Sequence, residues 1–279
     1  MIQRSEGPKI SIVTPSYNQA RFLATTIESV VHQEYPGLEF MIVDGGSTDD
    51  SLSIIHTYEN KIAYWTSEPD RGQSSAINKG FVRATGDIVA WLNSDDCYCK
   101  NALTVVGNYF ALHPGCMWLA GNILFTDVDG NIIQRKKPYF SRSILRHGSS
   151  SLYQPNVFVN RKVLKEVGFL NEEFHAIMDR EWFCRIAERY EPALVDVDLA
   201  LFRWHPASKS SSGNKSKHWH HYLNERVQVS GAKSQVLKYG LDRAPRAILA
   251  VLESVARAEK FVQRALYLFG VKRREQILK

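Results

Sequence analysis

Residues 9–92 alternate between short apolar runs and segments of helical spacing, and this alternation constrains the fold more than any other feature. A strand, loop and helix repeated four times implies a mostly parallel sheet with right-handed crossovers. The expected strands are residues 9–14, 38–44, 62–66 and 88–92. The expected helices are residues 21–32, a segment carrying Leu52, Ile54 and Ile55, and residues 74–84 with Ser74 as the N-cap.

Polar loops follow all four expected strands, at residues 15–18, 44–48, 70–73 and 93–96. In a parallel sheet these loops emerge at the same carboxyl edge, where open α/β sheets bind their ligands. We therefore expect the four loops to converge. Neither GxGxxG nor GxxxxGK[ST] occurs, which disfavours a dinucleotide-binding dehydrogenase and a P-loop NTPase.

The fourth loop places two carboxylates, Asp95 and Asp96, directly after a buried strand. Unpaired charges are costly in a core, so both should lie in a turn at the sheet edge. One interpretation is a turn whose polar side chains bond their own backbone. The other is a divalent-cation site, because such ions take oxygen ligands and share them with substrate phosphates. The convergence of the loops favours the cation site.

The pattern becomes mixed beyond Tyr98. Asp127-Val-Asp-Gly130 predicts a hairpin between a strand at residues 117–125 and a returning strand at 131–135. We expect residues 1–215 to form one catalytic α/β domain with a mixed sheet flanked by helices. Its remaining strands are expected at residues 154–160 and 193–204, and its remaining helices at 101–112, 161–167 and 179–189.

The net charge of +6 is concentrated at the C-terminus. Residues 241–279 contain nine Lys and Arg against four Asp and Glu, whereas the first 240 residues contain 26 against 25. A nearly neutral body disfavours a nucleic-acid-binding core. Residues 216–279 are expected to form a basic amphipathic helical extension. Two helices are expected in it, at residues 219–238 and 243–269. The second helix would either lie on an anionic membrane or pack on the catalytic domain or on a second subunit.

Cysteine usage and hydropathy bear on the compartment. The four cysteines form no CxxC pair and are typical of free thiols in a reducing compartment. The N-terminus lacks the apolar core of a signal peptide, and no run approaches the roughly 20 apolar residues of a membrane span. We expect a cytoplasmic protein, peripheral on the cytoplasmic face of a membrane if the extension binds lipid.

Six short motifs in a fixed order carry a resemblance to a known family. They are Thr14-Pro-Ser-Tyr-Asn18, Val43-Asp-Gly-Gly-Ser-Thr-Asp49, Glu68-Pro-Asp-Arg-Gly72, Asn78-Lys-Gly80, Leu92-Asn-Ser-Asp-Asp96 and Met178-Asp-Arg-Glu-Trp-Phe183. Together they resemble glycosyltransferase family 2 over residues 9–210. Each motif alone is weak, whereas the six in order are specific. The resemblance implies a Rossmann-like GT-A fold and inverting transfer of a sugar from a nucleotide diphosphate donor.

The resemblance also implies a donor site. Asp44 matches a carboxylate that accepts a hydrogen bond from the base, commonly N3–H of uracil, and an ionised carboxylate does accept without donating. Arg71 is suited to pair with a phosphate. The residues matched to the nucleotide sugar are Pro15, Ser16, Tyr17, Asp44, Asp70, Arg71, Ser94 and Asp95.

The metal site implied by the resemblance departs from the family pattern at one position. Asn93-Ser-Asp95 stands where the family has Asp-x-Asp, so the first carboxylate is an amide here. Asp95 is the expected ligand of Mn²⁺ or Mg²⁺, with Asp96 as a further ligand or its support. His205 resembles a late loop histidine that approaches the metal or the diphosphate. Its alternative is a loop histidine bonded to backbone.

Catalytic and acceptor residues follow from the last motif. Asp179 matches the catalytic base, and an ordinary Asp pKa of about 3.9 leaves it ionised at neutral pH. The alternative is a helix N-cap. Glu181 is the competing carboxylate and, with Gln154, is assigned to the acceptor side, where the alternative for Gln154 is packing at a strand edge. Trp91 and Trp182 are expected in the core rather than as sugar platforms.

The favoured function is a metal-dependent inverting glycosyltransferase that uses a nucleotide sugar, a UDP-sugar above others. Its acceptor would be a hydroxyl of a glycan or a lipid-linked saccharide. The alternative, motivated by Asn93, is a non-catalytic family member that binds nucleotide or scaffolds a membrane assembly. A nucleotidyltransferase would need a basic triphosphate-binding loop, and residues 14–18 contain no Lys or Arg.

Overall fold

The computed structural model describes residues 7–147, 152–206, 208, 225, 228 and 229. The predicted extension at residues 216–279 lies outside the described residues apart from Glu225, Gln228 and Val229. The second expected helix, at residues 243–269, lies wholly outside them, so the choice between a membrane, the catalytic domain and a second subunit as its partner stays a prediction. Within the described part of the chain, no helix is both long and apolar enough to cross a membrane.

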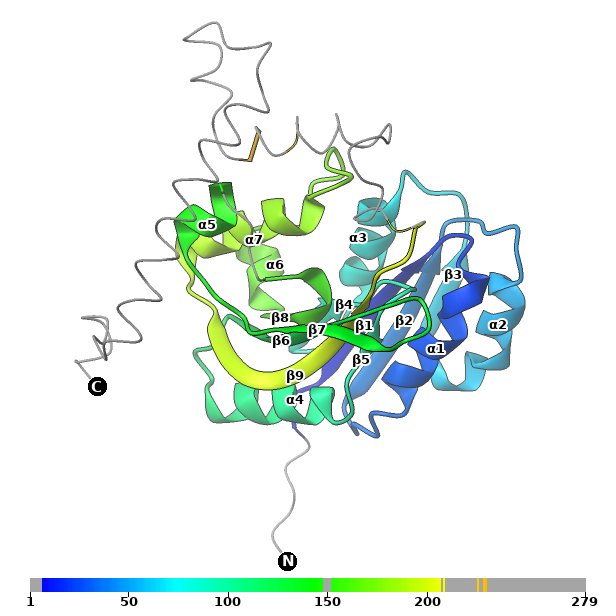
Figure 1. Cartoon of the computed structure of the whole chain (residues 1–279), viewed down its shortest axis with the longest axis horizontal. Helices are drawn as coiled ribbons and strands as arrows, with labels where there is room; N and C mark the ends of the chain where they lie inside the picture. Colours follow the sequence, from blue (N-terminus) through cyan, green and yellow to red (C-terminus); the bar gives the residue numbers. More distant parts are fainter. Residues whose placement is uncertain (1–6, 148–151, 207, 209–224, 226–227, 230–279) are drawn as a thin grey trace, which may run out of the picture.

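The first half of the chain forms the parallel part of a nine-stranded sheet (Figure 1). β1 (Ile10–Ser16) lies between β2 (Leu38–Asp44) and β4 (Ile88–Trp91), and β3 (Tyr64–Ser67) pairs with β2. All these pairs are parallel, as predicted, so the loops that follow the strands share one edge. The connecting elements are α1 (Ala20–Val31), α2 (Ser51–Thr57), the 3₁₀ turn η1 (Glu59–Lys61) and α3 (Gln73–Arg83).

The second half completes the sheet with strands of both directions. β8 (Val157–Asn160) is antiparallel to its neighbours β4 and β6 (Trp118–Thr126). β9 (Ala193–Arg203) runs parallel to β6 and antiparallel to β5 (Cys97–Tyr98). β7 (Ile132–Lys136) pairs antiparallel with β6, which confirms the predicted hairpin. The remaining helices are α4 (Ala102–Leu112), α5 (Arg142–His147), α6 (Lys162–Glu166) and α7 (Met178–Arg189).

The expected strand at residues 154–160 begins too early. Gln154–Asn156 forms the 3₁₀ turn η2, and only Val157 starts β8. Pro155 has no N–H for a strand ladder, and the Asn156 side chain accepts a hydrogen bond from the Tyr153 N–H at 3.1 Å, which closes the turn. β5 and α5 were not expected because elements of two and six residues carry no readable periodicity.

The predicted N-cap at Ser74 is wrong. α3 begins after Gly72, which has φ +112°, and Ser74 is already inside the helix. The Ser74 hydroxyl instead donates to the Phe174 carbonyl at 3.1 Å. This side chain therefore joins two segments that lie 100 residues apart in the chain.

Helices cover both faces of the sheet and build two cores. α1, α2 and α4 pack on one face, and α3, α5, α6 and α7 pack on the other (Figure 1). Alternate residues of β1 supply the two cores, because successive strand side chains point to opposite faces: Ile10 and Ile12 join the first core and Val13 the second. Trp91 and Trp182, 2% and 1% exposed, lie in the second core with their ring centroids 5.8 Å apart. Both are core residues, as predicted.

Gly80 allows α3 to lie close against β1. A Cβ at Gly80 would come within 2.5 and 2.6 Å of the two γ-carbons of Val13, which is fully buried. We expect Gly80→Ala to lower the free energy of unfolding by about 1–3 kcal/mol through overpacking, even though Ala favours a helix by about 1 kcal/mol. Urea unfolding measures this change. In a Val13→Ala background, which removes both methyl groups, the same substitution should no longer destabilise.

Candidate active site

Hydrogen bonds join the first two loops at the carboxyl edge of the sheet. The Asn18 N–H donates to the Ser47 hydroxyl at 2.8 Å, and the Asn18 side-chain oxygen accepts the Thr48 N–H at 2.9 Å. Asn18 has φ +52°, a left-handed conformation that Asn adopts more readily than most residues. The convergence predicted for these two loops is therefore confirmed, and Tyr17 stands beside them with 61% of its surface exposed.

Asp44 holds the second loop together. Its carboxylate is fully buried and accepts the Gly46 and Ser47 N–H groups at 3.0 and 2.8 Å and the Ser47 and Ser67 hydroxyls at 2.6 and 2.7 Å. Oδ2 takes three of these bonds and Oδ1 takes one. A base N–H would therefore have to reach the remaining lone pair of Oδ1. Reading of the base by Asp44 stays a prediction, and the structure shows Asp44 organising the turn.

The third loop lies against the second. The Asp70 Oδ1 accepts the Gly72 N–H at 2.7 Å, and Oδ2 lies so near Gly45 that a Cβ there would be 2.9 Å away. Arg71 is exposed, and among the described residues its guanidinium has no ion-pair partner. Arg71 is thus available for an anionic ligand, as the phosphate assignment requires.

The fourth loop carries a carboxylate–imidazole pair. The Asp95 Oδ2 lies 3.1 Å from the His205 Nε2, although the two residues are 110 positions apart. His205 is 6% exposed, and its ring packs on Phe22 with centroids 4.7 Å apart. Two of the predicted metal residues therefore lie side by side at the fourth loop, which we call the acidic loop (residues 93–96), and metal binding by His205 stays a prediction. The amide at Asn93 accepts a hydrogen bond from the Gln73 side chain at 2.6 Å, which joins the third and fourth loops.

Asp96 has a different environment from Asp95. It is buried, its Oδ1 accepts the Arg203 N–H at 3.0 Å, and its Oδ2 has no hydrogen-bond partner among the described residues. Burial, and then the charge of Asp95, raise the Asp96 pKa well above its usual range. The bond to Arg203 ties Asp96 to the end of β9. Whether Asp96 is a further ligand of the ion or a support for Asp95 stays a prediction.

Arg203 is a residue that the sequence did not single out. Its Nε donates to the Asp95 carbonyl at 3.1 Å and its Nη1 to the Val128 carbonyl at 2.9 Å. Its guanidinium also stacks 5.0 Å from the Phe22 ring centroid. Arg203 therefore fixes the backbone of the acidic loop from the end of β9. No local pattern indicates this contact, because it spans 108 residues.

Asp179 lies in the first turn of α7. Its Oδ1 accepts the N–H of the next residue, Arg180, at 2.7 Å. Burial raises the Asp179 pKa, the Arg180 N–H and charge oppose the shift, and Glu225 adds to it. A carboxylate with a raised pKa is a stronger base than an exposed one. The N-cap of α7 is Ile177, so the N-cap alternative for Asp179 is wrong, and its role as the catalytic base stays a prediction.

The start of α3 contacts both the segment just before Asp179 and the loop at residues 93–96. The Ser74 hydroxyl lies 2.8 Å from the Met178 sulfur, directly before Asp179, and a Cβ on Gly72 would be 3.9 Å from the His175 ring. The neighbouring residue, Gln73, donates a hydrogen bond to the Asn93 side chain. The start of α3 thus bonds both the acidic loop and the start of α7.

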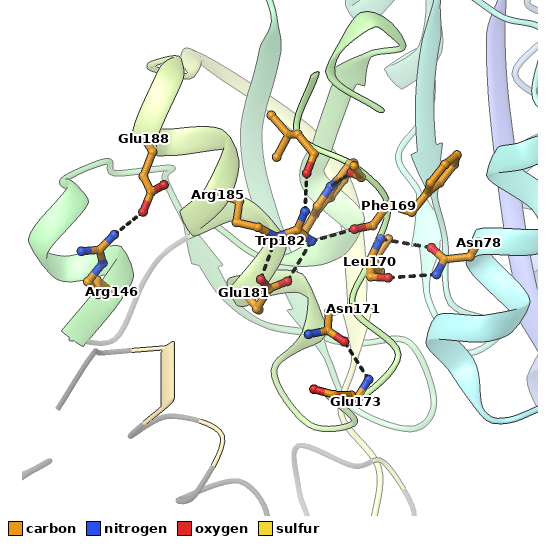
Figure 2. A network of polar contacts seen from close by, with 12 residues as sticks. Asn78, Arg146, Phe169, Leu170, Asn171, Glu173, Glu181, Trp182, Arg185 and Glu188 are labelled. Atoms are coloured by element: carbon orange, nitrogen blue, oxygen red, sulfur yellow. Dashed lines mark hydrogen bonds and ion pairs between the residues drawn. The ribbon is translucent and has the colours of Figure 1, made fainter. Parts of the chain in front are cut away.

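Glu181 belongs to a structural network around α7 (Figure 2). Both of its oxygens accept hydrogen bonds from Arg185, at 2.7 and 2.9 Å. Arg185 also donates to the carbonyls of Val167 and Phe169 at 2.6 and 2.7 Å. Figure 2 shows Glu181 turned toward Arg185 along the helix. The ion pair favours a structural role for Glu181, and an acceptor role stays a prediction.

Gln154 is bonded to the last residue of β4. Its side chain is 6% exposed and its Nε2 donates to the Trp91 carbonyl. Its Oε1 is buried without a hydrogen-bond partner in the part of the chain that the structure describes. The first contact matches the strand-edge alternative for Gln154, and the acceptor assignment stays a prediction.

The donor set at the fourth loop fits a divalent cation bound together with phosphate. Within the described residues, no three His, Cys, Asp or Glu side chains gather as a metal cage. Mg²⁺-type sites in nucleotide enzymes use one or two protein carboxylates and complete their shell with substrate phosphates and water. Asp95 with the adjacent His205 nitrogen supplies such a partial set. The residues present therefore fit the ion.

Comparison with known proteins agrees with this geometry. Residues 11–186 match the family described as Glycosyl transferase family 2. An uncharacterized glycosyltransferase of Mycobacterium tuberculosis is 29% identical over 204 residues, which cover 71% of this chain and 76% of that protein. The O-antigen biosynthesis protein RfbC of Myxococcus xanthus is 31% identical over 195 residues, 66% of this chain and 15% of the much longer relative.

Solved structures share the fold at low identity. S. aureus TarS 1–349, solved with UDP-GlcNAc, has a TM-score of 0.59 and 20% identity over 84% of this chain and 72% of that one. The mannosyltransferase PcManGT from Pyrobaculum calidifontis, solved with GDP-Man and Mn²⁺, has a TM-score of 0.55 and 17% identity. The match covers 96% of this chain and 87% of that one. These similarities confirm the predicted GT-A type fold. With more than half of its length matched, the chain belongs to glycosyltransferase family 2 and is a glycosyltransferase.

Proposed function

We propose that this enzyme is metal-dependent and inverting, and that it transfers a sugar from a nucleoside diphosphate donor, with UDP-sugars first, to a hydroxyl of a glycan or lipid-linked saccharide. The observation that carries the proposal is one connected network at the sheet edge. Asp95 contacts His205, Gln73 bonds Asn93 of the same loop, and the next residue, Ser74, contacts Met178, which directly precedes Asp179. The neighbours solved with UDP-GlcNAc and with GDP-Man and Mn²⁺, and the O-antigen relative, support it.

The reaction assigns tasks to four side chains, two of which share the metal ion. Asp179 takes the proton of the acceptor hydroxyl as its oxygen bonds to the anomeric carbon, and the bond from that carbon to the diphosphate breaks on the opposite face. The anomeric configuration therefore inverts. Arg71 pairs with the diphosphate. A divalent ion held by Asp95 and His205 would supply further positive charge at the leaving oxygens.

A donor screen followed by a transfer assay tests the proposal. Thermal unfolding is measured with UDP-, GDP- and TDP-sugars, each with and without Mn²⁺. A donor at about 100 times its dissociation constant should stabilise the protein by about 2.7 kcal/mol. The stabilising donor is then incubated with saccharide acceptors, and the anomeric configuration of the product is read by NMR. No stabilisation by any donor with Mn²⁺, or retention of configuration, would overturn the proposal.

A further inference from the structure

We infer that Glu225, which lies 39 residues beyond the end of the family-matched region, is a positioning residue for the catalytic base Asp179. The Glu225 carboxylate accepts three consecutive backbone N–H groups at the entrance of α7. Its Oε1 takes the His175 N–H at 2.8 Å, and its Oε2 takes the Ala176 and Ile177 N–H groups at 2.8 and 3.0 Å. This inference rests on the role proposed above for Asp179.

The local sequence explains why α7 needs an acceptor from elsewhere. The N-terminal N–H groups of a helix have no partner within the helix, and Ser, Thr, Asp or Asn at the N-cap normally accepts one of them. Here the N-cap is Ile177, whose side chain accepts nothing. Glu225, 4% exposed and 48 residues from Ile177, instead accepts the N–H of this N-cap residue and of the two residues before it, which fixes the chain where it enters the helix. Its negative charge also suits the positive end of the helix dipole.

The same contacts place a second carboxylate beside the base. Asp179 is two residues after Ile177, so the turn that Glu225 holds is the turn that aims Asp179. Among the described residues, the charged groups that act on Asp179 are Arg180, which lowers its pKa, and Glu225, which raises it, in addition to the larger effect of burial. Glu225 therefore affects both the direction of Asp179 and its strength as a base.

Glu225 does not stand alone in packing on the catalytic domain. Val229, four residues along, packs against the core that contains Trp182 and Phe183 of α7. Glu225 therefore bonds the entrance of α7, and Val229 packs against the core that α7 shares with the sheet. The consequence is that residues 11–186, the family-matched domain, hold the base correctly only when this later segment is in place.

The test compares Glu225→Gln and Glu225→Asp in the full-length chain, in the transfer assay with the donor found above. Glu225→Gln keeps the size of the side chain but removes its charge and one acceptor atom. Without the charge of Glu225 the Asp179 pKa should fall, so the acidic limb of the pH profile of kcat should move to lower pH. The kcat of this variant at neutral pH should also fall, by up to about 100-fold if Asp179 is displaced by 1 Å. Glu225→Asp keeps the charge but shortens the side chain. The acidic limb of its kcat–pH profile should therefore stay in place while its kcat falls. The donor KM should change little in either variant.

Glu39→Gln is the matched control. Glu39 is also a partly buried carboxylate with several hydrogen bonds, to Lys9, Ser11 and Thr85 near the opposite edge of the sheet, and its pKa is lowered to about 2. This control should lose stability without moving the kcat limb. If Glu225→Gln leaves the limb and kcat unchanged while Asp179→Asn is inactive, the inference fails and the proposed function stands. If Glu225→Gln does not fold, an unchanged kcat in Glu225→Asp overturns the inference.

An inactive wild-type protein would instead reject the proposed function. In that case the effect of Glu225 on Asp179 is read from stability. Asp179→Asn removes the part of the pH dependence of the unfolding free energy that Asp179 contributes. This part should be larger in the wild-type background than in the Glu225→Gln background, where an uncharged amide replaces the carboxylate. Equal dependence in both backgrounds would overturn the inference.

Discussion

Asp179→Asn is expected to lower kcat by about 10²–10⁴-fold, the usual contribution of a positioned general base. Asn has nearly the same shape but cannot take the acceptor proton. The donor KM should stay within a few-fold, because the contacts assigned to the donor lie on other loops. Steady-state transfer kinetics at neutral pH measure both parameters.

The same substitution should make the protein more stable at neutral pH. The Asp179 pKa is raised in the folded protein by burial and by Glu225. A carboxyl of this kind favours folding below its unfolded pKa and loses that contribution as the pH rises through its folded pKa. Asn does not titrate, so the unfolding free energy of Asp179→Asn relative to wild type should increase across that window and then level off. Urea unfolding at a series of pH values measures the difference.

Glu188→Gln is the control on the same helix. Glu188 is exposed and pairs with Arg146 at 2.7 Å, away from the helix start (Figure 2). Exposed pairs of this kind contribute about 0–1 kcal/mol, so kcat should not change and the pH dependence of stability should match wild type. An Asp179→Asn enzyme that keeps wild-type kcat would remove Asp179 from the reaction and leave its role as a helix-start residue.

Asp95→Ala is expected to lower kcat/KM by about 10³-fold. A divalent ion at the leaving diphosphate contributes several kcal/mol, and each 1.36 kcal/mol is tenfold in rate. Asp95 is the accessible carboxylate at the acidic loop and has His205 beside it, 3.1 Å away. Without it, Mn²⁺ should no longer increase the stabilisation of the protein by the donor. Calorimetric titration of the donor with and without Mn²⁺ measures the loss.

Chelation and a distant carboxylate provide the controls for Asp95. EDTA should abolish transfer by the wild type, and added Mn²⁺ should restore it. Asp87→Asn removes an exposed carboxylate whose contact is the Lys9 N–H at 3.1 Å, before β4 at the other end of that strand. It should leave the Mn²⁺ effect intact. Full activity of the wild type in EDTA would show that the reaction does not use a metal ion.

The sequence by itself determined the parallel half of the sheet and the edge at which its loops meet. β2 has the predicted bounds, Leu38–Asp44, because an apolar run that ends in Asp-Gly-Gly leaves little freedom in where the strand stops. The hairpin at residues 127–130 and the burial of Trp91 followed in the same way from short-range chemistry. These features depend on neighbours in the chain, which a pattern of residues records.

Only the tertiary structure decided how the polar side chains are used. Asp95 and Asp96 are adjacent and chemically identical, yet one faces His205 and the other is buried on Arg203, 107 residues away. Glu225 likewise accepts backbone N–H groups at the entrance of α7, about 50 residues earlier in the chain. A carboxylate accepts whatever donors the fold brings to it, and its burial sets its charge. Those donors come from distant segments, so the residue type limits the chemistry of each side chain while the packing of the chain selects its task.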